Sequence, residues 1–142
     1  MDNQYDILIL DDEPVVGQRL KPALEKEGHR VEIFVNPYRA LERVSEKEFD
    51  IVVTDIRMED IDGIQILERV RAMSERTKVV MITGYATIEV ARESLAKGAF
   101  DFIAKPFKLG EIRGVIQKAV DALRAEDQGK PVYHLCKNAW IS

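Results

Sequence analysis

The sequence predicts a single α/β domain built on a doubly wound parallel sheet. Short apolar runs alternate five times with segments whose apolar residues recur at helical spacing. Strands that alternate with helices favour a parallel sheet covered on both faces. Because crossover connections are right-handed, only a few doubly wound topologies remain.

The first half of the chain contains three expected strands and two expected helices. Strands are expected at residues 5–10, 30–35 and 50–54. Pro14 suits the first turn of a helix, and Gly28 ends that helix. The pair Asn36-Pro37 opens the second helix.

The second half continues the alternation. Ile64, Leu67 and Val70 mark the third helix, and strands are expected at residues 78–83 and 100–104. The fourth helix is expected from about residue 86 to residue 97, before Gly98. The last helix carries an apolar stripe from Leu109 to Leu123 at helical spacing.

Composition excludes several classes of protein. The chain has 142 residues, of which 46% are hydrophobic and 32% charged, as in ordinary globular domains. Its net charge of −4 argues against direct nucleic-acid binding, and no apolar run approaches the roughly 20 residues of a membrane span. No secretory signal precedes the first strand, and the single cysteine, Cys136, excludes an internal disulfide, so we expect a cytoplasmic protein. His29 and His134 lack metal-ligand spacing and are expected at the surface.

Charged and hydroxyl residues follow the apolar runs. Asp11 and Asp12 follow the first run, Asp55 the third, Thr83 ends the fourth, and Lys105 follows the fifth. Ligands of an open parallel sheet bind beyond the carboxyl ends of its strands. We therefore expect these side chains to converge on one rim.

The residue types on this rim suit phosphoryl acceptance. Clustered carboxylates repel one another unless a divalent cation neutralises them, and oxygen ligands suit Mg²⁺. A carboxylate beside Mg²⁺ can attack phosphorus, while a lysine neutralises charge on the phosphoryl oxygens. Each residue alone also has a purely structural interpretation. Asp11, Asp12 and Asp55 could cap helices, Thr83 could simply end a strand, and Lys105-Pro106 could form an ordinary loop.

These motifs together resemble the response-regulator receiver family. The resemblance spans about residues 5–125 and rests on the strings at residues 9–14, 55–58, 82–87 and 98–107. It implies a flavodoxin-like fold, a five-stranded sheet of order 2-1-3-4-5 flanked by five helices. This strand order is one of the common orders of doubly wound sheets and is known for that family. It implies a two-component switch rather than an enzyme, promoting only its own phosphorylation and slow dephosphorylation.

The resemblance also assigns roles to individual residues. Asp55 resembles the phosphorylation site. Asp11, Asp12, Asp55 and the backbone carbonyl of Arg57 resemble the ligands of Mg²⁺, for which Mn²⁺ can substitute. Lys105 and Thr83 resemble the residues that stabilise the phosphoryl group, and a cis bond before Pro106 would aim the lysine inward. Thr83 and Phe102 resemble a switch pair.

Two departures from the family pattern concern the neighbourhood of Asp55. Glu59 stands where the family usually has proline, which we expect to alter the loop without abolishing phosphorylation. Arg57 and Tyr85 are bulky residues where hydrolytic water approaches, so they are expected to tune dephosphorylation toward a long-lived phosphoryl group.

The implied partners are a sensor histidine kinase or phosphotransfer protein and an output domain or partner. The output contact is expected through the surface of the fourth helix, fifth strand and fifth helix, with a phosphorylation-dependent homodimer as a further expectation. Transcription regulation is the output expected by analogy. No nucleic-acid or membrane contact is expected of this chain.

Two other functions stay open at this stage. A Mg²⁺-dependent phosphatase with an Asp nucleophile would need a second acid two residues later, where Arg57 stands. A flavodoxin-like cofactor binder would need a phosphate-binding loop in place of the acidic segment 11–13. Residues 126–142 are interpreted separately from the domain at 1–125, as a linker start, an appendage or a cloning remnant.

Overall fold

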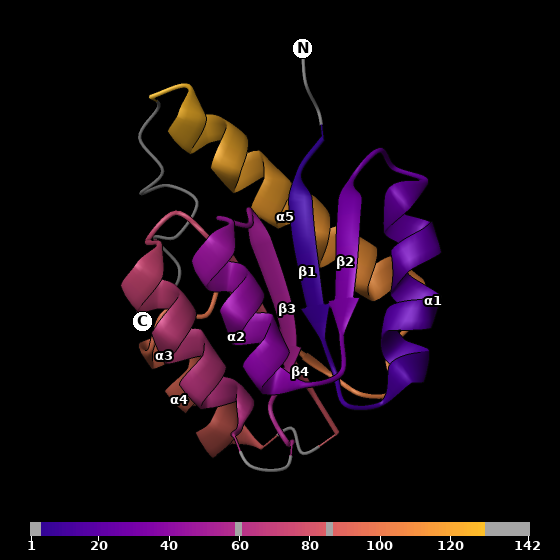
Figure 1. Ribbon diagram of the computed structural model, residues 1–142, viewed down its shortest axis with the longest axis vertical. Coiled ribbons are helices and arrows are strands. Elements are labelled where there is room, and N and C mark those ends of the chain that lie inside the picture. The colour runs from indigo at the N-terminus through magenta and orange to yellow at the C-terminus, as the bar shows by residue number, and fades with distance from the viewer. Residues whose placement is uncertain (1–3, 59–60, 85–86, 130–142) are drawn as a thin grey trace.

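The computed structural model describes residues 4–58, 61–84 and 87–129. Its centre is a five-stranded parallel sheet of order β2-β1-β3-β4-β5, which confirms the expected topology. The strands are β1 (Asp6–Leu10), β2 (Arg30–Phe34), β3 (Ile51–Asp55), β4 (Lys78–Thr83) and β5 (Asp101–Ala104). All neighbouring strands pair in parallel, so their carboxyl ends meet at one end of the sheet, at the arrowheads in Figure 1.

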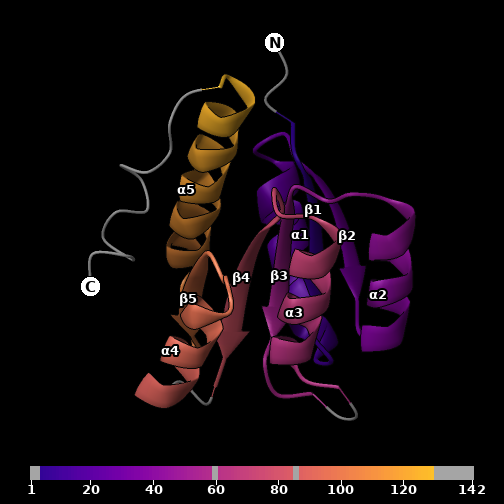
Figure 2. The same cartoon turned by 90° about the vertical axis from the view of Figure 1, so that its left-hand side faces the viewer.

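Five helices alternate with the strands. They are α1 (Pro14–Glu25), α2 (Pro37–Glu46), α3 (Gly63–Met73), α4 (Ile88–Ala96) and α5 (Leu109–Asp127). In Figure 1, α5 crosses behind the sheet. In Figure 2, α4, β5 and α5 stand together at one edge of the sheet, where both helices contact β5.

The alternation of side chains along each strand divides the core into two layers. Ile7, Ile9 and Val53 face the layer that contains Leu20 of α1 and Ile116 of α5. Leu8, Val52 and Met81 face the opposite layer. That layer contains Ala40 of α2 and Leu67 of α3, and Val90 of α4 packs against it. The near-continuous apolar strands are explained by burial on both faces.

Polar residues define where several helices begin. The Asn36 side chain accepts hydrogen bonds from the backbone N–H groups of Tyr38 and Arg39, as expected for the start of α2. Thr87 caps α4 by accepting from Val90 N–H. The helix therefore begins at Ile88, later than the expected start near residue 86.

Two expectations near the helix ends need correction or extension. His29 is buried rather than exposed: it is 8% exposed, it lies beside Tyr5, and its Nδ1 accepts a hydrogen bond from the Tyr5 backbone N–H. Helix α5 continues beyond residue 125, and Glu126 and Asp127 form ion pairs with Lys78 and Arg76. The separate role of residues 126–142 stays a prediction, and His134 lies outside the described residues.

The helices that the structure describes include none with the length and apolar character needed to cross a membrane.

Candidate functional site at the carboxyl end of the sheet

Four of the expected site residues lie at strand ends on one side of the molecule. Asp55 is the last residue of β3, Thr83 is the last of β4, Asp11 directly follows β1, and Lys105 directly follows β5. We call Asp11, Asp12, Asp55, Thr83 and Lys105 the carboxyl rim. Its convergence follows from the parallel pairing of β1, β3, β4 and β5.

Local backbone features hold these positions. Gly63 starts α3 against the end of β3, where an added Cβ would lie 2.2 Å from the Asp55 carbonyl oxygen. The Lys105–Pro106 peptide bond is cis, as the resemblance implied, and Lys105 N–H donates to the Thr83 carbonyl at 2.8 Å. The close approach of α3 therefore fixes the end of β3 at Asp55. The hydrogen bond between Lys105 and Thr83 fixes Lys105 beside the end of β4.

The ammonium of Lys105 joins the acidic residues. Its Nζ lies 2.7 Å from Asp11 Oδ2 and 2.9 Å from Asp55 Oδ2. Asp11 is 2% exposed and Asp55 is 5% exposed, while the Lys105 side chain is 17% exposed. The structure thus brings together three residues at the ends of β1, β3 and β5 that the sequence predicted to converge.

Three carboxylates lie close enough to hold a divalent cation. One oxygen each from Asp11, Asp12 and Asp55 lies within 4.8 Å of the others. Hard oxygen ligands with several carboxylates fit Mg²⁺, so the donor set is suited to the expected cofactor. Asp12 is exposed, whereas the other two are buried, so one side of the cluster is open to solvent.

Burial and ionic contacts have opposite effects on the pKa values of Asp11 and Lys105. Burial raises the pKa of Asp11 to about 6, although the hydrogen bond from Lys105 opposes this shift; the nearby Asp55 charge raises the pKa further. Burial alone would lower the pKa of Lys105, but its hydrogen bonds to Asp11 and Asp55 raise it overall. Lys105 is therefore a fixed positive charge that only partly offsets the buried acids.

Thr83 and Phe102 lie on adjacent strands and face the same side of the sheet. Thr83 pairs with Ala104, two residues after Phe102. Because alternate strand residues share a face, the two side chains lie diagonally on the face of the second core layer. Thr83 is fully buried, and Phe102 is partly buried against that layer. Their arrangement agrees with the expected pair, while their coupling stays a prediction.

Arg57 lies at the mouth of the site. Its side chain is exposed, and its backbone N–H donates to Asp55 Oδ1 at 3.2 Å. Arg57 also lines a pocket of about 300 Å³ together with Asp12, Glu13, Asp55, Gly84 and Lys105. Tyr85, the other residue expected to tune dephosphorylation, and Glu59 both lie outside the described residues.

Glu13 is a site residue that the sequence reasoning did not assign. Its Oε1 lies 3.1 Å from Lys105 Nζ, which makes it the third carboxylate on that ammonium. Its place directly after Asp11-Asp12 was visible in the sequence, but the direction of an exposed side chain was not.

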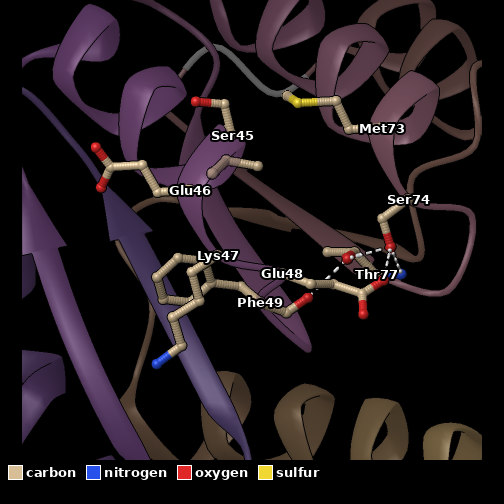
Figure 3. Close-up of a pocket in the computed structure, with 9 residues that line it drawn as sticks. Ser45, Glu46, Lys47, Glu48, Phe49, Met73, Ser74 and Thr77 are labelled. Atoms are coloured by element: carbon tan, nitrogen blue, oxygen red, sulfur yellow. Dashed lines mark hydrogen bonds between the residues drawn. The ribbon is translucent and has the colours of Figure 1, made fainter.

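Three further hollows in the described part of the chain lack this acidic cluster. One of about 400 Å³ lies at the opposite end of the strands and is lined by residues including Phe49, Met73, Ser74 and Thr77 (Figure 3). Its polar groups bond to one another: Thr77 Oγ1 donates to the Phe49 carbonyl at 2.6 Å, and Ser74 Oγ donates to Glu48. The charge pattern therefore places the candidate site at the carboxyl rim.

Residues 7–117 match the family described as the response regulator receiver domain. The chain is similar to Regulatory protein AtoC of Escherichia coli (strain K12), with 38% identity over 129 residues. That match covers 91% of this chain and 27% of the relative, so this chain spans about a quarter of that relative's length.

In two further comparisons, the match covers almost the whole length of the other protein. Sporulation initiation phosphotransferase F of Bacillus subtilis (strain 168) is 34% identical over 112 residues, which cover 79% of this chain and 90% of that protein. The solution structure of the beryllofluoride-activated NtrC4 receiver domain dimer superposes with a TM-score of 0.79 and 28% identity. It covers 83% of this chain and 98% of that one.

Proposed function

Because the chain belongs to the response regulator receiver domain family, we propose that it acts as a phosphorylation switch with Asp55 as the acceptor. The observation that carries this assignment is the contact of Lys105 Nζ with both Asp11 and Asp55 at the carboxyl rim. Of the three clustered acids, Asp55 combines burial with a place in the lining of the solvent-open pocket. The phosphoryl donor is a histidine kinase or a phosphotransfer protein.

The proposed reaction is a transfer onto the protein itself. An Asp55 carboxylate oxygen forms a bond to phosphorus while the bond from phosphorus to the donor's histidine nitrogen breaks. Lys105 then balances charge on the phosphoryl oxygens, and the Thr83 hydroxyl donates a hydrogen bond to one of them. The Arg57 backbone N–H keeps the Asp55 carboxylate oriented through its 3.2 Å bond.

Asp11, Asp12, Asp55 and the backbone carbonyl of Arg57 would hold Mg²⁺, with Mn²⁺ as a substitute. The clustered oxygens of the three acids support this assignment. When bound, the cation supplies positive charge that offsets carboxylate repulsion and favours phosphoryl transfer. Asp11 contributes buried negative charge to this site, and Lys105 holds Oδ2 of Asp55 at 2.9 Å.

Phosphorylation is proposed to change the surface formed by α4, β5 and α5. The movement of Thr83 toward the phosphoryl group would vacate space on the second-layer face, and Phe102 would then turn inward. The diagonal placement of the two side chains supports this coupling. The two conformations are those before and after Thr83 and Phe102 move. The change in their populations depends on how much better the second conformation accommodates the phosphoryl group than the first.

The phosphoryl group is proposed to be long-lived. The exposed Arg57 side chain lines the pocket beside Asp55, where water must approach. We expect the double variant Arg57→Asn/Tyr85→Glu to lose its phosphoryl group faster than the wild type, because smaller or acidic groups admit and orient water. An unchanged rate of dephosphorylation would contradict this tuning role.

The output of the switch is proposed from the relatives. The match to Regulatory protein AtoC covers only 27% of that protein, which supports an output domain beyond the matched region. The NtrC4 receiver domain is described as a dimer in its beryllofluoride-activated form. We therefore propose phosphorylation-dependent dimerisation through the α4-β5-α5 surface, with transcription control as the output.

The family assignment does not favour the phosphatase or the cofactor binder. The residue two positions after Asp55 is Arg57, which cannot serve as a general acid in the manner of a carboxylic acid. The first loop presents Asp11, Asp12 and Glu13, which would repel a cofactor phosphate.

Phosphorylation with a small phosphodonor tests the function. Wild type and Asp55→Asn are incubated with acetyl phosphate and Mg²⁺, and intact mass is measured. We expect one phosphoryl group on the wild type, loss of the signal with EDTA, and none on Asp55→Asn. Asp121→Asn, which changes an exposed acid on α5, serves as the matched control and should behave as wild type. A normal yield on Asp55→Asn would refute the assignment.

A further inference from the structure

The Lys105 ammonium has three carboxylate neighbours, and the third comes from Glu13. Nζ lies 2.7 Å from Asp11, 2.9 Å from Asp55 and 3.1 Å from Glu13. An ammonium has three N–H donors, so each carboxylate can take one. Asp11 and Asp55 are almost fully buried, whereas the Glu13 side chain is 65% exposed, so Glu13 contacts Lys105 from the solvent side.

The backbone of Glu13 is fixed while its side chain is directed away from the adjacent helix. Glu13 N–H donates to Asp11 Oδ1 at 2.8 Å, and the Glu13 carbonyl accepts from Val16 N–H at 3.2 Å. Glu13 is the N-cap residue of α1, yet its side chain makes no capping hydrogen bond. Its carboxylate contacts Lys105 instead, at the wall of the 300 Å³ pocket.

Glu13 is also distinct from the acids suited to hold a cation. The cluster of oxygens within 4.8 Å comprises Asp11, Asp12 and Asp55 and does not include Glu13. Lys105 contacts two members of that cluster, so the ammonium and a divalent cation compete for the negative charge of the same two carboxylates. A carboxylate that holds Lys105 from outside the cluster weakens the interaction of Lys105 with Asp11 and Asp55, which favours the cation.

We propose that Glu13 is a positioning residue that draws Lys105 toward the pocket mouth and thereby favours Mg²⁺ at Asp11, Asp12 and Asp55. The inference rests on the proposed function, because it assumes that these acids hold Mg²⁺. It assigns Glu13 no contact with the cation. Without its carboxylate, the ammonium bonds more fully to Asp11 and Asp55, and Mg²⁺ binds less tightly. Since Glu13–Lys105 is a partly exposed ion pair, the expected change in Kd is roughly two- to fivefold.

Two substitutions at Glu13 separate position from charge. Glu13→Gln removes the charge, whereas Glu13→Asp keeps the charge but shortens the side chain by one methylene group. Aspartate at an N-cap also bonds readily to the N–H groups of its own helix, which would direct it away from Lys105. Positioning therefore predicts that both variants bind Mg²⁺ more weakly than wild type.

Backbone-amide NMR titrations with Mg²⁺ alone would give the Kd of each protein. Glu25→Gln, an exposed charge change on the same helix, is the control and should match wild type. Urea unfolding of each metal-free variant should show no marked loss of stability relative to wild type, and Glu13→Asp gains what its new N-cap bond adds; this separates the effect on Mg²⁺ binding from a general loss of structure. A roughly two- to fivefold higher Kd for both Glu13 variants supports the proposal.

Two results would overturn the positioning role. The first is a wild-type Kd for Glu13→Asp with a raised Kd for Glu13→Gln, which would mean that charge alone acts. The second is a wild-type Kd for both variants. In either case, phosphorylation of wild-type Asp55 would leave the proposed function standing. By contrast, a wild type that neither binds Mg²⁺ nor accepts a phosphoryl group would overturn both.

Discussion

The two ends of the sheet use the same kinds of charged residue with opposite electrostatic results. At the amino end, we call Asp6, Arg30, Lys47, Asp50 and Arg76 the amino rim. There the hydrogen bond from Arg30 lowers the pKa of Asp6 in spite of partial burial, and Lys47 lowers it further. At the carboxyl rim, burial raises the pKa of Asp11 to about 6 in spite of Lys105.

The difference lies in how acids and cations are distributed. On the amino rim, Arg30 and Lys47 both pair with Asp6, and Arg76 pairs with Asp50. On the carboxyl rim, Lys105 serves two buried acids as well as Glu13. The amino rim therefore stabilises the fold, whereas the carboxyl rim holds excess negative charge that a divalent cation can relieve.

The largest expected effect is at Asp11. Asp11→Asn should stabilise the metal-free protein at neutral pH, because it removes a buried charge. A pKa of about 6 rather than 3.8 corresponds to an upper figure of about 3 kcal/mol. Urea unfolding with and without Mg²⁺ measures this gain, and Mg²⁺ should stabilise the variant less than it stabilises the wild type. A less stable metal-free variant would contradict the electrostatic difference between the rims.

The sign of the pH dependence follows from the same shift. The folded-state pKa of Asp11 is raised, so its contribution to stability is present below pH 3.8 and is lost as pH rises through about 6. The Asp11→Asn protein should lack this loss, whereas Asp121→Asn should retain it.

Asp50 provides the opposite test on the amino rim. Its Oδ2 accepts the Asp6 backbone N–H at 2.6 Å, and its Oδ1 pairs with Arg76. Asp50→Ala leaves that N–H and that guanidinium without this partner, so we expect a loss of about 2 kcal/mol. Urea unfolding should show the same loss with and without Mg²⁺. Asp50→Asn, which keeps one acceptor, should lose less; an equal loss would indicate that these bonds are not the cause.

Asp6 provides a smaller effect, visible on acidification. Its folded-state pKa is lowered, chiefly by Arg30, so its stabilisation is present above pH 3.8 and is lost as pH falls through the folded pKa. Asp6→Asn should remove this component, with a neutral-pH change of less than about 1 kcal/mol. Acid titration followed by circular dichroism measures it. An acid transition that is unchanged in the variant would count against ion pairing as the source of stability.

The smallest expected effect comes from His29, beside the amino rim. Burial lowers its pKa from 6.5, although Glu27 and Asp50 oppose this shift. Its contribution to stability is therefore present above pH 6.5 and lost as pH falls toward the folded pKa. His29→Gln should flatten the dependence of the urea midpoint on pH between about 5 and 7. A slope equal to that of wild type would show that His29 does not titrate there.

The sequence pattern was sufficient for the alternation of strands and helices and for the main members of the carboxyl rim. Asp11, Asp55 and Lys105 could be placed because each ends or follows an apolar strand, and parallel pairing brings those ends together. The strand order itself depended on resemblance, since periodicity does not distinguish one doubly wound order from another.

Side-chain directions were less accessible from sequence. Glu13 follows two acids in the sequence, yet its carboxylate contacts Lys105, which is 92 residues away along the chain. His29 was expected at the surface because it lacks metal-ligand spacing, but its ring packs near Tyr5 with centroids 6.0 Å apart. Both contacts depend on tertiary packing, which local spacing does not encode.

The most direct measurement locates the phosphoryl group on the chain. Protein phosphorylated with acetyl phosphate and Mg²⁺ is treated with borohydride, which reduces an aspartyl phosphate to homoserine, and the modified residue is identified by peptide mass mapping. We expect homoserine at position 55 alone, and none when EDTA is present. Modification at Asp11 or Asp12, or no acyl phosphate on the wild type, would contradict the assignment of Asp55 as the acceptor.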